Sequence, residues 1–135
     1  MKLVLDNNIL FSLMNPLSVS SYLFFYINAK FIAPEFIRSE FEKYKEVILS
    51  RSGLSEQEFE TRQKEIEKSI EFIDESKYEK FLNTNLSDPK DLPYFALALS
   101  TSSAIWSNDS HLKKQRHVRV FTTKEIINMI LNNQV

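Results

Sequence analysis

The sequence of 135 residues contains no cysteine and a single glycine, Gly53. Without cysteine the chain cannot form disulfides, thiolate zinc sites or iron–sulfur clusters, and it has no cysteine nucleophile. Average glycine usage of about 7% would supply roughly nine or ten glycines, and a single one cannot build the glycine-rich motifs that bind dinucleotides or nucleoside triphosphates. Any chemistry must therefore depend on the oxygen and nitrogen groups of side chains.

The sequence also lacks an excess of charge of one sign and a long apolar segment. Seventeen basic residues face eighteen acidic ones, for a formal net charge of -1, so binding to a phosphate backbone would need a local basic patch. The longest apolar stretch, residues 22–27, is far shorter than the roughly 18 residues that span a bilayer. Residues 6–8 are polar and interrupt the apolar N-terminus before a secretion signal can form. We therefore expect a cytoplasmic protein without a membrane segment, folded as one domain over residues 1–135.

Short apolar runs alternate with helical patterns along the chain. The runs that predict strands lie at 3–5, 30–33, 104–106 and 118–121. The patterns that predict helices lie at 9–14, 19–27, 35–49, 55–74, 89–100 and 123–131, the last capped by Thr123. This alternation predicts an α/β fold with a mostly parallel sheet, in which ligands bind at the carboxyl ends of the strands.

The region between residues 35 and 74 is strongly charged. Residues 51–53 divide it into two predicted helices, and Ser55 followed by Glu58 has the form of a capping box. The apolar stripe of the second helix consists of Phe59, Ile66, Ile70 and Ile73. We expect a charged helical hairpin, with residues 52–74 forming its solvated second half.

The acidic residues are unevenly distributed. Thirteen of the eighteen lie between Glu35 and Lys80. Outside that region, Asp6 ends the first predicted strand and Asp109 follows the strand at 104–106, so a parallel sheet would bring both to one edge. Asp88 and Asp91 begin the helix between them and, like the other two, can serve simply as helix caps. Converging carboxylates would repel one another and raise their pKa values, which a bound divalent cation relieves.

Glu40 falls within an apolar helical stripe. The apolar members of this stripe are Phe36, Ile37, Phe41, Tyr44, Val47 and Ile48. An ionised carboxylate on a core-facing side is costly unless it has a partner. Glu40 is thus expected either to pair with a lysine or arginine at the margin of the stripe or to face a metal pocket.

Four short motifs occur in the order found in a known family. They are Leu5–Leu10, Ser39–Phe41, Asp88–Pro93 followed by Ala96–Ala98, and Trp106–Asp109. Together they resemble the motifs of the PIN domain, a family of small metal-dependent ribonucleases with a three-layer α/β/α sandwich. The chain departs from the pattern at Asn7, where the family often has threonine or serine, and its charged hairpin looks longer than usual.

The resemblance implies both a site and a chemistry. It identifies Asp6, Glu40, Asp91 and Asp109 as the acidic cluster, adds Asp88 as a fifth candidate, and gives Asn8 and Ser107 supporting roles. Hard oxygen ligands suit Mg²⁺ or Mn²⁺, and the expected reaction is hydrolysis of RNA phosphodiester bonds. Small members of the family resemble the toxin of a VapBC-type toxin–antitoxin pair, which implies a homodimer inhibited by a small antitoxin.

Three further groups of residues have two readings each. The basic residues after Asp109 either contact the RNA backbone or form a solvated loop; they are Lys113, Lys114, Arg116 and Arg119, with Lys124 nearby. The aromatic run of Tyr22, Phe24, Phe25 and Tyr26 either enters the core or forms an oligomer interface. His111 and His117 either act as bases or metal ligands or are solvated surface residues; we expect the second, which leaves them outside the site.

Two other classes of protein remain open from the residues alone. A response-regulator-like receiver also places aspartates and Mg²⁺ at strand ends, although it usually carries an acidic pair where this chain has Asp6 followed by Asn7. A catalytically inactive PIN-like module would use the hairpin and the aromatic run to bind a protein, with the acids acting as caps. Phosphoryl-donor labelling tests the first alternative, and metal binding tests the second.

Overall fold

The computed structural model describes residues 1–83 and 88–134. Within this part of the chain, one sheet of parallel strands runs in the order β3-β2-β1-β4-β5. The strands are β1 (Lys2–Leu5), β2 (Lys30–Pro34), β3 (Ile70–Ile73), β4 (Ala104–Trp106) and β5 (Val120–Phe121). Leu3, Val4 and Leu5 are completely buried, as expected of a central parallel strand that is covered on both faces.

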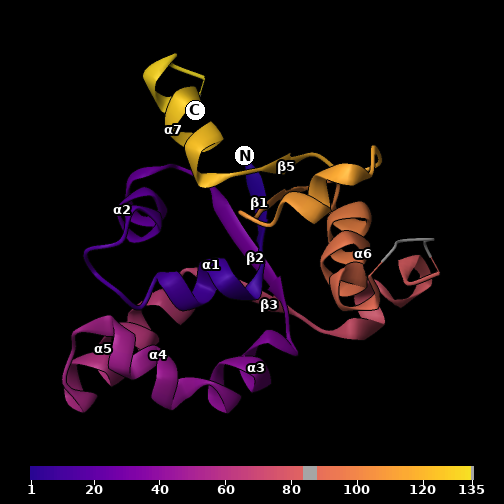
Figure 1. Cartoon of the computed structure of the whole chain (residues 1–135). Coiled ribbons are helices and arrows are strands. Elements are labelled where there is room, and N and C mark those ends of the chain that lie inside the picture. Colours follow the sequence, from indigo (N-terminus) through magenta and orange to yellow (C-terminus); the bar gives the residue numbers. More distant parts are fainter. Residues whose placement is uncertain (84–87, 135) are drawn as a thin grey trace.

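Helices cover both faces of the sheet. They are α1 (Asn7–Ser12), α2 (Val19–Tyr26), α3 (Ile37–Lys43), α4 (Lys45–Ser52), α5 (Glu56–Lys68), α6 (Leu92–Thr101) and α7 (Thr123–Leu131), with short 3₁₀ turns η1 (Glu75–Lys77), η2 (Glu79–Phe81), η3 (Pro89–Asp91) and η4 (Ser110–Lys114). Helix α6 packs against β1, β2 and β4 on one face, and α1 and α2 lie on the other (Figure 1). The result is the three-layer α/β/α sandwich that the resemblance implies.

The strand order places a switch point between β1 and β4. From β1 the chain builds outward through β2 to β3, and then returns to add β4 and β5 on the other side. Ligands of open α/β sheets bind beside such a reversal, at the carboxyl ends of the strands. Receivers have the order 2-1-3-4-5 instead, so the receiver-like alternative does not fit this sheet.

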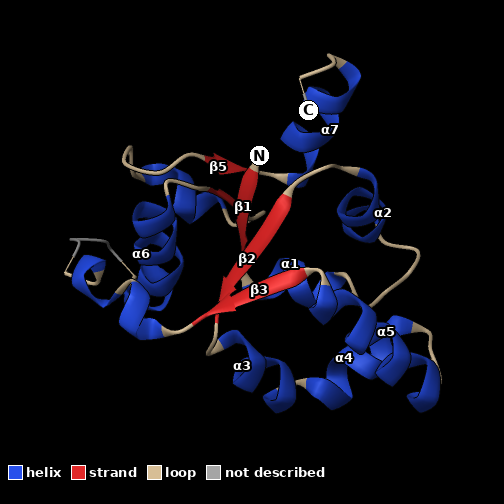
Figure 2. Ribbon diagram, turned by 180° about the vertical axis from the view of Figure 1, so that it is seen from behind, coloured by secondary structure: helices blue, strands red, loops and turns tan. Residues whose placement is uncertain are grey.

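Strand β3 corrects the prediction of a helix over residues 55–74. Helix α5 ends at Lys68, and the next residues pair with β2, with Ile70 beside Phe31 (Figure 2). The spacing of Ile66, Ile70 and Ile73 fits a helix, but the run Ile-Glu-Phe-Ile is equally suited to a strand because β-branched and aromatic residues favour sheets. Pairing satisfies the backbone groups along the outer edge of β2, which a helix would leave open.

Three other boundaries differ from the prediction. The helix predicted over 35–49 is divided at Tyr44, whose φ of −106° and ψ of 13° separate α3 from α4. The final strand covers only Val120–Phe121, and Thr122 rather than Thr123 caps α7, with its side chain and that of Glu125 forming a capping box. The predicted hairpin is present in shortened form, as α4 followed by α5. Gly53 ends α4 with a φ of 75°, the left-handed conformation that glycine adopts freely, and the chain then turns into α5.

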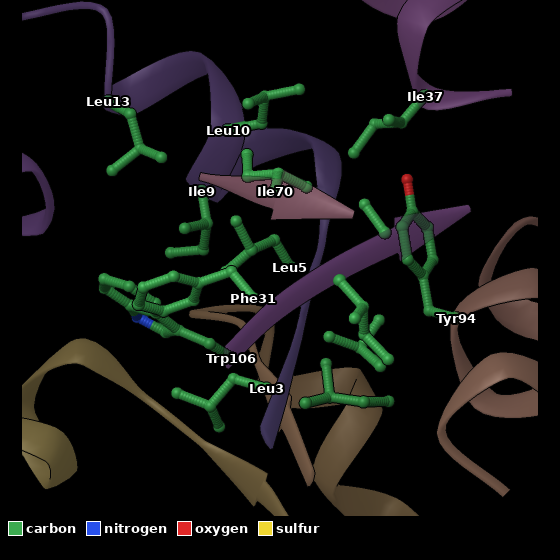
Figure 3. Close-up of a cluster of buried hydrophobic side chains, with 14 of the residues drawn as sticks. Leu3, Leu5, Ile9, Leu10, Leu13, Phe31, Ile37, Ile70, Tyr94 and Trp106 are labelled. Atoms are coloured by element: carbon green, nitrogen blue, oxygen red, sulfur yellow. The ribbon is translucent and has the colours of Figure 1, made fainter. Parts of the chain in front are cut away.

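The core lies mainly between α1, the sheet and α6. Ile9 of α1 points toward Phe31 and Trp106 of the sheet (Figure 3), and Leu10 and Leu13, the C-cap of α1, belong to the same buried cluster. The buried Trp106 donates its indole N–H to the Thr123 hydroxyl at 3.1 Å, which satisfies its polar group. No helix in residues 1–83 or 88–134 has the length and apolar character needed to cross a bilayer.

Candidate active site

The ends of β1 and β4 hold Asp6 and Ser107 side by side. Leu5 is paired with Trp106 in the sheet, so the next residue of each strand is also adjacent. The Ser107 hydroxyl donates a hydrogen bond to Asp6 Oδ2, and Asp6 Oδ1 accepts one from the Ile9 amide at 2.8 Å. Asp6 therefore has both roles considered for it: it caps α1, and it lies at the switch point of the sheet.

Asp6 is buried without a cationic partner among the described residues. Its exposed fraction is 4%, and burial raises its pKa from the ordinary value of 3.8 to about 6. The hydrogen bonds from Ser107 and Ile9 oppose this shift, whereas the negative charges of Asp109 and Asp91 add to it. The protein thus holds unneutralised negative charge at this edge of the sheet.

The Ser107 hydroxyl also connects Asp6 to Asp109. Its oxygen accepts a hydrogen bond from the Asp109 amide at 3.0 Å. Asp109 in turn caps η4 by accepting from the His111 amide at 2.9 Å. A single buried hydroxyl therefore fixes the backbone of one candidate acid and the side chain of another.

A cleft of about 1230 Å³ opens at this edge of the sheet. Its walls come from α1, α3 and α4 on one side and from η1, η3 and the start of α6 on the other. Among its lining residues are the four candidates Glu40, Asp88, Asp91 and Asp109, together with Asn8. Asp6 is adjacent to the lining residue Asn7 and lies beneath the surface of the cleft.

The two aspartates at the start of α6 differ in their surroundings. Asp88 is exposed and caps η3 by accepting from the Lys90 amide at 3.0 Å. Asp91 is half-buried, and burial together with the charges of Asp88 and Asp109 raises its pKa, against the opposing effect of His111. Asp91 is therefore electrostatically coupled to the acids at the strand ends, and Asp88 lies further out on the rim.

Glu40 faces the cleft and has no ion-pair partner in the described part of the chain. Only Ile37, Phe41 and Ile48 of the predicted apolar stripe are buried. The stripe's other members, Phe36, Tyr44 and Val47, are exposed and line the cleft with Glu40. The expectation that this whole face enters the core was wrong, because the faces of α3 and α4 are shared between the core and an open cleft.

Tyr94 is a site residue that the sequence patterns did not indicate. It belongs to the apolar helix α6 and is only 4% exposed, yet its side chain lines the cleft with the ring 5.7 Å from that of Phe36. Burial and the nearby charge of Asp6 raise the pKa of its hydroxyl, a hydrogen bond from the Asn7 backbone lowers it, and Glu40 and Asp91 add smaller effects. Figure 3 shows the hydroxyl pointing away from the apolar cluster toward α3. Tyr94 follows the apolar pattern of α6, so the sequence gives no signal that its hydroxyl faces the cleft.

The donor chemistry of these residues fits a hard divalent cation. All the acidic candidates offer carboxylate oxygens, and Asn8 adds an amide oxygen on the cleft wall, which suits Mg²⁺ or Mn²⁺ better than softer metals. Seven of the described lining residues are acidic and three are basic, so an added cation would relieve repulsion. In residues 1–83 and 88–134, however, no three acidic or histidine side chains already converge into a metal-binding group.

The basic residues after Asp109 lie outside the lining of this cleft. Lys113 forms an ion pair with Glu125, and the Arg119 guanidinium lies 5.3 Å from the centre of the Phe121 ring. Lys114 and Arg116 are exposed, as are His111 and His117. The basic side chains that do line the cleft are Lys43, Arg51 and Lys90.

The chain belongs to the PIN domain family, whose model matches residues 4–128. This confirms the resemblance drawn from the four motifs and gives the chain a nuclease-type fold, one that is generally used by metal-dependent ribonucleases. No curated protein matches the chain.

Proposed function

We propose that this protein is a Mg²⁺- or Mn²⁺-dependent endoribonuclease whose site comprises Asp6, Glu40, Asp91 and Asp109, with Asp88 at the rim. The observation that carries the proposal is the buried Asp6, whose pKa is raised by its surroundings at the switch point of a PIN-type sheet. Carboxylates that repel one another without an ion pair in the described part of the chain are a costly arrangement for a purely structural site.

In the proposed reaction the chain's own groups bind and orient. The bound cation would polarise the scissile phosphate and lower the pKa of a water molecule from about 15.7, so no side-chain nucleophile is needed. Asp6 would be held in place by Ser107 and Ile9, while Asn8 on the cleft wall would support the position of the substrate. Glu40 of α3, on the same wall as Asn8, and Asp91, on the other wall, would complete the set of oxygen ligands.

Metal binding should be tested before cleavage, because an unsuitable RNA and an inactive enzyme give the same negative result. Mn²⁺ is titrated into the ¹⁵N-labelled protein, and paramagnetic line broadening is recorded residue by residue. Broadening should concentrate around Asp6, Glu40, Asp91 and Asp109 and disappear in Asp6→Asn. Glu75→Gln removes a carboxylate that lines the same cleft outside this group, so it serves as the control that keeps the broadening.

Broadening spread along the exposed acids of α5, with the four candidates unaffected, would overturn the metal site. It would favour the alternative of an inactive PIN-like module whose acids act only as caps. If the metal binds as proposed, Asp6→Asn and Asp109→Asn should abolish RNA cleavage without loss of fold, and full cleavage by either variant would contradict the assignment.

The proposal extends to the partners of the protein. We place it as the toxin of a VapBC-type pair, acting in the cytoplasm as a homodimer that a small antitoxin inhibits. The exposed aromatics of α2 support a protein interface, because the rings of Tyr22 and Tyr26 stack 5.6 Å apart on the surface and Phe25 is half-exposed beside them, while only Phe24 enters the core. Tyr22→Asp should convert a dimer to monomers in analytical ultracentrifugation; an unchanged dimer would exclude this surface.

A further inference from the structure

Two exposed aromatic rings line the cleft on the wall opposite α6. Phe36 is 36% exposed and Tyr44 is 40% exposed, although both belong to the stripe that the sequence assigns to the core. An aromatic ring exposed to solvent in a cleft does not gain the stabilising free energy that burial in the core would give it. Two such rings on one wall of the cleft form an apolar surface on which a flat ligand can pack.

These rings lie on either side of Glu40 along one helical face. Phe36 is the N-cap of α3, Glu40 lies within α3 and Tyr44 is its C-cap, and their spacing of four residues places them on the same side of this helix. At about 1.5 Å per residue, the Cα atoms of Phe36 and Tyr44 are separated along the axis by about 12 Å. Glu40 is thus an acidic position between two flat apolar surfaces, all three facing the same cleft.

Each ring contacts another aromatic side chain, Tyr44 that of Phe11 on the same wall and Phe36 that of Tyr94 on α6, across the cleft. Tyr44 lies 6.0 Å from Phe11, and Phe36 lies 5.7 Å from Tyr94, measured between ring centres. Phe11 also contacts Phe41 of α3, with 6.1 Å between ring centres. These contacts orient the rings before any ligand arrives, which lowers the entropic cost of binding.

Two cations lie on the same wall, Lys43 directly before Tyr44 and Arg51 near the end of α4. Lys43 and Arg51 line the cleft, and the Lys43 ammonium lies 5.3 Å from the centre of the Tyr44 ring. No ion pair neutralises either cation in the part of the chain that the structure describes. Flat aromatic surface next to unpaired positive charge is the combination that binds single-stranded nucleic acid, through stacking on bases and attraction to phosphates.

We propose that Phe36 and Tyr44 form a base-stacking subsite for unpaired nucleotides, with Lys43 and Arg51 contacting the adjacent phosphates. This inference rests on the proposed ribonuclease function and identifies which form of RNA the cleft accepts. A base-paired duplex would present its stacked bases edge-on to these rings, so only an unpaired segment offers an exposed face. The subsite therefore selects loops or single strands over duplex.

The test uses a short single-stranded RNA that carries 2-aminopurine, whose fluorescence is quenched by stacking. The full-length protein is mixed with it rapidly in Mg²⁺, so that quenching is recorded before cleavage, and the dissociation constant is measured by titration. Tyr44→Leu keeps apolar volume against Phe11 but removes the flat ring; it should lose the quenching and weaken binding about fivefold or more, the effect of one lost stacked base. Tyr44→Phe should preserve both quantities.

Leu131→Ala is the control, because Leu131 is 73% exposed on α7, outside both the cleft lining and the α2 surface; it should change neither quenching nor affinity. The same RNA with abasic positions in place of bases should bind about as weakly to the wild type as the intact RNA binds to Tyr44→Leu. Equal quenching by wild type and Tyr44→Leu, or tight binding of the abasic RNA, would overturn the subsite and leave the rings as a contact for a protein.

Failure of this inference is distinguishable from failure of the proposed function. Asp6→Asn should abolish cleavage while leaving the quenching intact, whereas Tyr44→Leu should lose the quenching and raise the RNA concentration needed for half-maximal cleavage. If Asp6→Asn still cleaves RNA, the nuclease assignment is wrong, regardless of the result for Tyr44→Leu. If both variants quench like the wild type, the stacking subsite alone is wrong.

Discussion

Ser107 and Asp6 are 101 positions apart in the sequence, yet the Ser107 hydroxyl donates a hydrogen bond to the Asp6 carboxylate. The register of β1 and β4, which pairs Leu5 with Trp106, brings them together. Because the same hydroxyl accepts from the Asp109 amide, a completely buried serine organises two candidate acids at once.

Replacing Ser107 by alanine should lower both stability and the acidity of Asp6. The lost hydroxyl leaves a buried carboxylate oxygen without its partner, which costs about 1–3 kcal/mol of unfolding free energy. The hydrogen bond from Ser107 lowers the Asp6 pKa, so its removal should raise that pKa above about 6. Urea denaturation measures the first effect, and a ¹³C NMR titration of the Asp6 carboxyl carbon measures the second.

Ser50→Ala is the control for this change. The exposed Ser50 hydroxyl bonds only to the Val47 carbonyl, one turn earlier in its own helix, so its loss should alter stability by less than about 0.5 kcal/mol. Equal stability losses in the two variants would show that the Ser107 hydroxyl has no special role.

The stability of the metal-free protein should depend on pH through Asp6. Burial raises the pKa of Asp6 from 3.8 to about 6, so the folded protein binds this proton more tightly than the unfolded chain does. The contribution is complete below pH 4 and is lost as the pH rises to about 6, which lowers the free energy of unfolding by up to about 3 kcal/mol. Denaturation curves across this range measure the slope.

Asp6→Asn isolates the contribution of this carboxyl group. Asp91, whose pKa is also raised, acts in the same direction but is still present in the variant. The difference in slope between wild type and Asp6→Asn therefore reports Asp6 alone. Parallel curves between pH 4 and 6 would show that Asp6 titrates normally in the folded protein.

Arg62 should be a major attachment between the charged hairpin and the rest of the molecule. Its Nε–H donates to the Leu13 carbonyl at 2.8 Å, and its Nη2 donates to the Ser21 hydroxyl. Arg62→Ala leaves both acceptors short of a charged donor and should cost about 1.5–3 kcal/mol of unfolding free energy. Lys64→Ala on the same helix, where the side chain is exposed, should cost almost nothing; similar losses in thermal or urea unfolding would contradict this role.

The sequence predicts the central architecture because local pattern determines it. The runs at Leu3–Leu5 and Ala104–Trp106 are short, apolar and followed by polar residues, which favours buried strands, and Asp6 and Asp109 come after them. Strand β3 was missed because Ile70–Ile73 satisfies two periodicities, and only the presence of β2 beside it decides between them. Its assignment depends on tertiary contact, which no local pattern contains.

The candidate site also has a part that the sequence predicts and a part that depends on tertiary packing. Four acidic positions follow from motifs in the chain, and three of them line one cleft while Asp6 lies beneath it. Tyr94 and the exposure of Tyr44 could not be predicted, because a hydrophobic period describes which side of a helix is apolar and not whether that side meets the core or a cleft. The split of the helix at Tyr44 redirects its second half, a consequence of packing rather than of composition.

The loop after Asp109 should contribute to RNA binding through its unpaired cations. Lys114 and Arg116 are exposed without an ion-pair partner among the described residues, whereas Lys113 already pairs with Glu125. Each phosphate contact to a single strand adds about 0.7 to the slope of log affinity against log salt. Replacing Lys114 and Arg116 by glutamine should therefore reduce that slope by about 1.4. Lys113→Gln should change it less, because the ion pair with Glu125 must break before Lys113 can contact a phosphate.

Fluorescence anisotropy of a labelled single-stranded RNA across a salt series measures the slope, and the double replacement of Lys64 and Lys68 on α5 controls for net charge. An unchanged slope in the Lys114 and Arg116 variant would leave the cations of the cleft as the contacts to RNA phosphates.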